Sequence, residues 1–175
     1  MLSFLENAPV IVNFAANQFV DGIESICDVG CGMGKYGLLI KERYLSMMAE
    51  LYITPRWDKK LIAVEDNMWF WQNSAIDEIY DDSFWDDAFD TLPDAEMYLF
   101  IDIAEHHSKE KFFELVNSLH GKTVLVSTPR NTVMYTEHYY GDARHHITQY
   151  LESDFSEWRH NLSTDLSLIY ATRIQ

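Results

Sequence analysis

The residues best suited to bind a ligand or do chemistry lie in one stretch, Ser25-Ile-Cys-Asp-Val-Gly-Cys-Gly-Met-Gly-Lys-Tyr-Gly37. Its compact apolar start predicts a buried parallel strand. Gly30, Gly32 and Gly34 then predict a turn with positive φ, in which bare backbone can approach a ligand. A helix after this turn would direct its free N–H groups at the same ligand. The spacing differs from the dinucleotide motif G-x-G-x-x-G, because Lys35 stands where the third glycine would be.

A second acidic group ends the next predicted strand, residues 60–65. Glu65 would face the edge of the glycine turn, where a carboxylate can accept hydrogen bonds from both hydroxyls of a ribose. Asp66 is the alternative ribose acceptor. The separation between turn and acid exceeds the usual spacing of about 20 residues. An insertion around residues 51–59 would account for the extra length.

The glycine stretch and three later blocks resemble, in order, the motifs of class I S-adenosylmethionine-dependent methyltransferases. The likeness runs from about residue 25 to residue 155. The four blocks are Asp28-Val-Gly-Cys-Gly-Met-Gly34, Leu61-Ile-Ala-Val-Glu65, Leu99-Phe-Ile-Asp-Ile-Ala-Glu-His106 and Val124-Leu-Val-Ser-Thr-Pro129. The resemblance implies that the cofactor is S-adenosyl-L-methionine and that S-adenosyl-L-homocysteine is the product.

Alternating helical and strand patterns predict an α/β fold in one domain, residues 1–175. We expect a Rossmann-like, doubly wound, mostly parallel sheet with helices on both faces and a shortened antiparallel C-terminal edge. Within the domain we expect a leading helix in 1–22, a cofactor-binding core in 23–128, and a substrate-side loop, helix and edge strand in 129–175. The leading helix either packs on the sheet or covers the cofactor.

Individual elements follow from periodicity and from breaking residues. The predicted helices are 9–20, 35–51 and 68–76, one capped by Ser108, and one capped by Thr148. The predicted strands are 25–30, 60–65, one near 78–81, 96–102, 122–128 and 166–174. Residues 131–147 are predicted as a loop.

The resemblance also implies which residues contact the cofactor. The glycine turn would approach its amino-acid part, with the Asp28 carboxylate near the ammonium group. A residue after Glu65 would contact adenine, and Met68 is our choice. An acid after the third strand would hold the adenine amino group; Asp81, Asp82 and Asp87 compete, and we adopt Asp87. The full predicted set is Asp28, Gly30, Cys31, Gly32, Gly34, Glu65, Asp66, Met68, Asp87 and Asp102.

Histidines are the expected catalytic groups, because an oxygen nucleophile needs a base whose pKa is near the working pH. The block Asp102-Ile-Ala-Glu-His106 and the later His146-Ile-Thr-Gln-Tyr150 are similar to blocks of some small bacterial family members. They favour His106 and His146 as catalytic residues. A two-histidine, one-carboxylate metal site is an alternative, drawn from Glu105, His106, His107, Glu137, His138, His145 and His146. No fixed ligand spacing supports it, so we predict no metal.

Composition narrows the partners and the compartment. The chain carries 13 basic and 28 acidic residues, a formal charge of −15. Such acidity disfavours a nucleic-acid partner, which needs Lys and Arg to neutralise phosphates. Its two cysteines form no disulfide framework, and no signal peptide or membrane-spanning run is visible. We therefore expect a cytoplasmic protein with a small-molecule substrate.

The predicted function is methyl transfer from S-adenosylmethionine to a small-molecule or sugar-like acceptor. A non-catalytic protein that binds S-adenosylmethionine or S-adenosylhomocysteine is the alternative from another class. A nicotinamide-dependent oxidoreductase is a third possibility, which the missing G-x-G-x-x-G spacing disfavours.

Overall fold

The computed structural model describes residues 5–87, 89, 91–130, 136–139 and 142–175. These residues form two compact units, Leu5–Glu96 and Met97–Gln175. Each unit combines parallel strands with helices.

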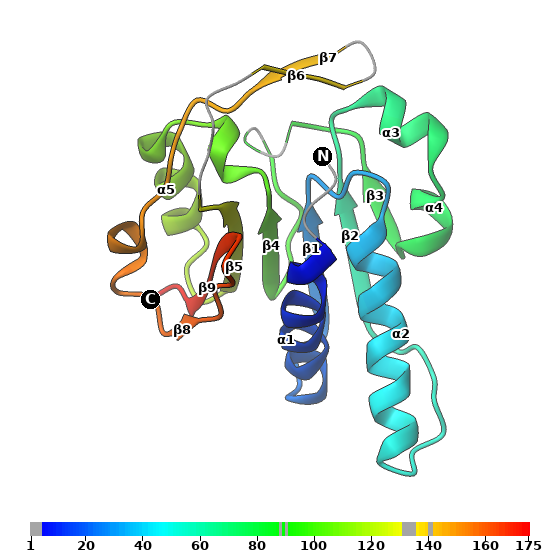
Figure 1. The fold of residues 1–175 in the computed structure, drawn as a ribbon. Helices are drawn as coiled ribbons and strands as arrows, with labels where there is room; N and C mark the ends of the chain where they lie inside the picture. The colour runs from blue at the N-terminus through cyan, green and yellow to red at the C-terminus, as the bar shows by residue number, and fades with distance from the viewer. Residues whose placement is uncertain (1–4, 88, 90, 131–135, 140–141) are drawn as a thin grey trace. The chain divides into compact units, whose positions relative to one another are not determined.

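The first unit contains three parallel strands in the order β3-β2-β1. The register pairs Val29 of β1 with Val64 of β2, and Val64 with Phe84 of β3. The carboxyl ends of the three strands therefore lie at one edge (Figure 1). The elements are η1 Leu5–Asn7, α1 Ala8–Val20, β1 Ser25–Val29, α2 Lys35–Glu50, β2 Lys60–Val64, α3 Met68–Asn73, α4 Ile76–Ile79 and β3 Asp82–Phe84.

Apolar runs explain why β1 and β2 are central strands, since four consecutive residues are buried in each. Helix α1 packs against α2 and buries Ile11, Ala15 and Phe19 at helical spacing. The segment between α2 and β2 folds back, so that Trp57 contacts Phe19 and Tyr44 with ring centroids 5.6 and 5.7 Å apart. Trp57 thus packs the segment 51–59 onto this unit, and its being an insertion stays a prediction.

The second unit contains four strands in the order β4-β5-β9-β8 and a separate β6-β7 hairpin (Figure 1). Strands β4 and β5 are parallel, whereas β9 is antiparallel to both β5 and the two-residue β8. The elements are β4 Met97–Ile101, η2 Ala104–His106, α5 Lys109–Ser118, β5 Thr123–Pro129, β6 Thr136–Tyr139, β7 Asp142–His145, η3 Glu152–Phe155, β8 His160–Asn161 and β9 Ser167–Arg173.

Aromatic side chains form much of the second core. Phe112 of α5 contacts Phe100 of β4 and Tyr150, with ring centroids 5.6 and 5.7 Å away. Phe155 stacks on Tyr150 and on Tyr170 of β9. These contacts hold the segment after the hairpin against α5 and the sheet.

The predicted fold class is confirmed: the strands are mostly parallel, and the C-terminal edge is antiparallel and short. Ser108 caps α5 as predicted, because its hydroxyl accepts a hydrogen bond from the Lys111 N–H. None of the helices in the described part of the chain has the length and apolar character that a membrane span requires.

Three element predictions were wrong. The third strand is Asp82–Phe84, because Ile76–Ile79 forms a helical turn where the strand was expected. The predicted loop 131–147 contains the β6-β7 hairpin. Thr148 caps no helix: its hydroxyl donates to the His107 carbonyl, and η3 begins only at Glu152.

Candidate functional site

The glycine turn after β1 has the backbone conformation that its sequence predicted. Gly30, Gly32 and Gly34 have φ values of 68°, 57° and 81°, all in the region that favours glycine. The N–H groups of Gly30 and Cys31 donate to the Val64 carbonyl at 2.8 and 3.2 Å, which fixes the turn to the end of β2. The turn is therefore tied to the strand whose next residue is Glu65.

Glu65 connects this turn to the start of α3. One carboxylate oxygen accepts a hydrogen bond from the Gly32 N–H at 2.8 Å, and the other accepts from the Asn67 N–H at 2.8 Å. The side chain is only 3% exposed. A carboxylate oxygen can accept more than one hydrogen bond, so a ligand hydroxyl could share this carboxylate with the two N–H groups. The expectation that Glu65 faces the glycine turn is confirmed, and its contact with ribose stays a prediction.

Asp28 lies buried beneath the turn and is bound by a residue that the sequence analysis missed. The Tyr80 hydroxyl donates to the Asp28 carboxylate at 2.5 Å and accepts from the Gly37 N–H at 3.2 Å. Burial raises the pKa of Asp28 to about 6; the hydrogen bond from Tyr80 lowers it, and the charge of Glu65 raises it. Burial also raises the pKa of Tyr80, so its hydroxyl remains a donor.

Close packing around Tyr80 explains a fourth glycine. A Cβ added at Gly37 would lie 2.4 Å from the Tyr80 ring and 2.6 Å from its hydroxyl. A Cβ at Gly34 would lie 2.9 Å from Ile79. Gly37 therefore makes room for the tyrosine that holds Asp28, a relation that no local pattern reveals.

The acidic residues near β3 lie at opposite ends of the strand. Asp81 and Asp82 lie at its amino end: Asp81 accepts from the Leu61 N–H and the Trp57 indole, and Asp82 pairs with Lys60. Asp87 follows the carboxyl end, and its side chain accepts from the Phe89 N–H at 2.9 Å. Only Asp87 of the three lies at the strand end where adenine was expected.

The remaining predicted cofactor residues of this unit differ in exposure. Asp66 and Met68 are exposed. Cys31 is buried, and burial raises the pKa of its thiol well above the usual value. Trp85, which the sequence analysis did not single out, is 58% exposed, and its indole N–H donates to the Asp66 carbonyl at 3.1 Å.

In the second unit, Asp102 directly follows β4 and has a strained backbone conformation. Its φ is 54°, which is uncommon for a residue with a side chain, and such strain gathers at functional sites. Its N–H donates to the Ser127 carbonyl at 2.8 Å, and its side chain is buried. The backbone that follows turns directly into η2, which carries Glu105 and His106.

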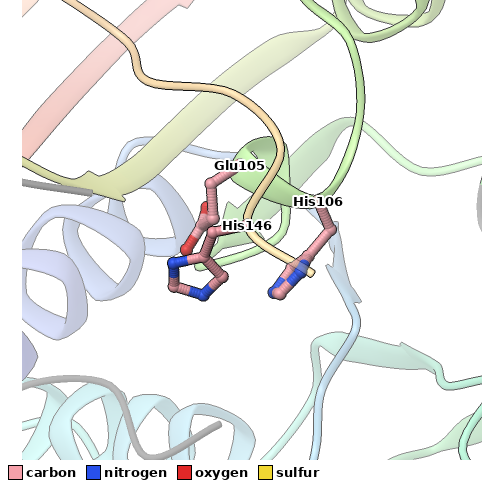
Figure 2. Close-up of side chains that lie close together, drawn as sticks. All are labelled: Glu105, His106 and His146. Carbon is pink, nitrogen blue, oxygen red and sulfur yellow. The ribbon is translucent and has the colours of Figure 1, made fainter. Parts of the chain in front are cut away.

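Glu105, His106 and His146 form a cluster although 40 residues separate the two histidines in sequence (Figure 2). One donor atom from each residue lies within 4.8 Å of the others. The two imidazole rings meet edge to face, with centroids 4.8 Å apart and planes at 77°. Glu105 and His146 are buried and His106 is partly exposed. The structure thus brings together both predicted catalytic histidines.

Backbone hydrogen bonds hold the segment after His146 against η2. The N–H groups of Ile147 and Thr148 donate to the Glu105 carbonyl at 2.9 and 3.2 Å. The Thr148 hydroxyl donates to the His107 carbonyl at 2.6 Å. The Tyr150 hydroxyl donates to the Ala104 carbonyl at 3.3 Å. His146 is therefore positioned by four hydrogen bonds between residues that are far apart in the sequence. Of Glu137, His138 and His145, also considered for a metal, the structure describes the backbone and not the side chains.

Solved structures with a similar fold include S-adenosylmethionine-dependent methyltransferases. Magnesium protoporphyrin IX methyltransferase (ChlM) from Synechocystis PCC 6803, with bound SAM, matches with a TM-score of 0.63 at 13% identity, over 95% of this chain and 77% of that chain. The S-adenosylmethionine-dependent methyltransferase SibL in its apo form gives 0.64 at 15% identity, over 96% and 55%. A methyltransferase from Clostridium acetobutylicum ATCC 824 gives 0.62 at 9% identity, over 95% and 92%.

The chain has the fold of the class I S-adenosylmethionine-dependent methyltransferases. No protein-family model and no curated protein sequence matches it. The match in fold agrees with the resemblance that the four sequence blocks carry.

Proposed function

We propose that the protein transfers a methyl group from S-adenosylmethionine to a small-molecule or sugar-like acceptor. One observation carries this proposal: the buried carboxylate of Glu65 accepts a hydrogen bond from the Gly32 N–H, within a turn of three positive-φ glycines. Such a turn at the carboxyl end of a parallel strand suits a nucleoside joined to an amino acid. Similar structures that hold SAM or SAH support the same cofactor here.

Each residue of the first unit has a proposed role toward the cofactor. The turn from Gly30 to Gly34 binds the amino-acid part, and Glu65 binds the ribose, with Asp66 as a second acceptor. Met68 and Asp87 contact adenine. Asp28, which is bound to Tyr80, supports the turn from beneath. Its raised pKa means that it carries less than a full charge near pH 6.

Residues of the second unit are proposed to act on the molecule that accepts the methyl group. In the transfer, a lone pair on the acceptor forms a bond to the methyl carbon while the carbon–sulfur bond breaks and its electrons return to sulfur. The sulfonium is already activated, so orientation supplies much of the rate. A hydroxyl acceptor also loses its proton, and His106 or His146 would accept it. Asp102 adds a buried carboxylate at the end of β4.

Calorimetric titration of the full chain with S-adenosylhomocysteine tests the proposal. We expect one site per chain. Titration with NAD provides the comparison and should give no heat of binding. Absence of S-adenosylhomocysteine binding would overturn the proposed function. Binding without methyl transfer to any acceptor of a hydroxyl-compound panel would instead support a non-catalytic cofactor-binding protein.

A further inference from the structure

We propose that Glu105, His106 and His146 bind one divalent transition-metal ion, and that this ion binds the acceptor through a hydroxyl group. This inference rests on the proposed function and replaces the role of the histidines as proton acceptors. It also departs from our sequence-based expectation that no metal is present.

The donor set matches the preferences of such ions. Two imidazoles and one carboxylate from three residues form a common site for Zn²⁺, Fe²⁺ and related ions, and they leave coordination positions open. All three donors belong to the second unit, and their nearest atoms lie within 4.8 Å. Figure 2 shows that the Glu105 carboxylate lies beside the His146 ring and that the His106 ring lies on the other side of that histidine.

Burial favours a cation at this place. Glu105 is 0% exposed and His146 is 5% exposed. A buried carboxylate is costly unless it is paired with positive charge or bound to a metal. Neutral imidazoles add donors without adding charge. A divalent ion held by these donors would place its positive charge beside the carboxylate and would coordinate both imidazoles.

The scaffold is rigid where a metal site needs rigidity. Glu105 and His106 are consecutive residues of η2, and the hydrogen bonds from Ile147, Thr148 and Tyr150 tie the segment that carries His146 to η2. Donor atoms around one such ion are about 3 to 3.5 Å apart, since each lies about 2.1 Å from it. The cluster would have to contract by about 1.5 Å. His106 is the most exposed of the three donors, so the contraction would come mainly from rotation of its ring.

The open positions define an acceptor class. A metal ion lowers the pKa of a bound hydroxyl, so that the proton passes to solvent water and the oxygen can attack the methyl carbon. Two free positions would bind an acceptor that offers a hydroxyl next to a second oxygen, as vicinal diols and catechols do. Such acceptors include the sugar-like class already proposed.

Cobalt titration tests the site directly, because Co²⁺ absorbs visible light strongly when nitrogen and oxygen ligands hold it in four or five coordination. The full chain, without a histidine tag and treated with a chelator beforehand, should bind one equivalent of Co²⁺. Glu105→Gln, His106→Gln and His146→Gln should each weaken Co²⁺ binding by at least about 100-fold. Loss of a residue that only hydrogen-bonds a metal ligand already lowers metal affinity by about 10- to 100-fold. His160→Gln, at an exposed histidine of β8, should bind like the wild type.

Titration of S-adenosylhomocysteine on the same metal-free samples separates the two proposals. Retained S-adenosylhomocysteine affinity shows that a variant is folded, and it tests the proposed function without metal. Wild-type protein that binds S-adenosylhomocysteine but no Co²⁺ would overturn the metal site alone. Equal Co²⁺ binding by wild type, Glu105→Gln and His146→Gln would also overturn it. Full methyl transfer to a diol in excess chelator would overturn the metal's role in acceptor binding.

Discussion

The glycine turn and the histidine cluster are built in opposite ways. The turn relies on backbone N–H groups and one carboxylate, Glu65, supplied by neighbouring parallel strands. The cluster relies on side chains, and hydrogen bonds between residues 104–107 and 147–150 bring them together. A site made from local backbone is visible as a motif, whereas a site made by long-range contacts is not. The comparison predicts that substitutions in the glycine turn change cofactor affinity. Substitutions in the histidine cluster should instead change metal binding and acceptor binding.

The largest expected effect comes from Glu65→Ala. This variant should lose about 100-fold in S-adenosylhomocysteine affinity, because hydrogen bonds to charged groups contribute about 1.5 to 3 kcal/mol each. Calorimetric titration measures the change. Glu42→Ala, at an exposed position of α2, is the matched control. Glu105→Ala should leave this affinity within about twofold; a loss equal to that of Glu65→Ala would show that the two regions are not functionally separate.

Gly37→Ala should destabilise the first unit. Alanine in place of glycine ordinarily stabilises a helix by up to about 1 kcal/mol. Here the new methyl group would lie 2.4 Å from the Tyr80 ring, so overpacking should win and lower the free energy of unfolding by about 2 kcal/mol. Urea denaturation measures the difference. Leu38→Ala, at the next and exposed position of α2, should change it by less than about 0.5 kcal/mol. A Gly37→Ala variant as stable as wild type would show that Tyr80 is not tightly held.

The raised pKa of Asp28 predicts a specific pH dependence of stability. The folded state keeps the proton up to about pH 6, whereas the unfolded chain releases it near the ordinary aspartate pKa of 3.8. The folded state therefore binds more protons in this window, and rising pH costs stability. From pH 5 to pH 8 the wild type should lose roughly 1.5 kcal/mol more than Asp28→Asn, which has no such titration.

Urea denaturation of both proteins at several pH values provides the measurement. Asp66→Asn, at an exposed neighbouring strand end, serves as the control and should follow the wild type. Parallel pH profiles for wild type and Asp28→Asn would contradict the raised pKa.

The smallest expected effect comes from Thr148→Val. This variant removes the hydroxyl that donates to the His107 carbonyl and keeps the shape of the side chain. The free energy of unfolding should fall by about 1 kcal/mol. Co²⁺ affinity should fall several-fold, because the segment that carries His146 becomes less fixed. Visible spectroscopy and urea denaturation follow the two effects, with Thr172→Val, at a partly exposed threonine of β9, as the control. Unchanged Co²⁺ affinity would show that Thr148 does not position the cluster.

The elements predicted correctly from the sequence are those whose conformation is determined by neighbouring residues in the chain. Strand β1, the glycine turn and helix α2 follow from a continuous run, so their order and conformation were predicted correctly. Glu65 was found because a parallel strand delivers its last residue to the edge where the turn lies. The sequence failed for β3, a three-residue strand with two exposed residues and therefore no apolar signal.

The interactions that the sequence did not reveal are long-range. Tyr80 reaches Asp28 across 52 residues, and Thr148 reaches His107 across 41. Thr148 precedes apolar residues at helical spacing and resembles a cap, but its hydroxyl donates a tertiary hydrogen bond to the His107 carbonyl instead. His106 and His146 were chosen by resemblance, while the contact between their rings required the fold. Neither relation has a sequence spacing from which it could be derived.

Cys31 lies inside the glycine turn, between Gly30 and Gly32, two positions whose positive φ favours glycine. The thiol is 7% exposed, and burial keeps it protonated. Since only an exposed thiolate reacts with alkylating reagents, Cys31 should be modified only when the turn opens. The rate of alkylation under native conditions therefore reports how often the turn opens. A bound nucleoside should slow that rate in proportion to its occupancy, so the chain contains its own chemical reporter for the cofactor.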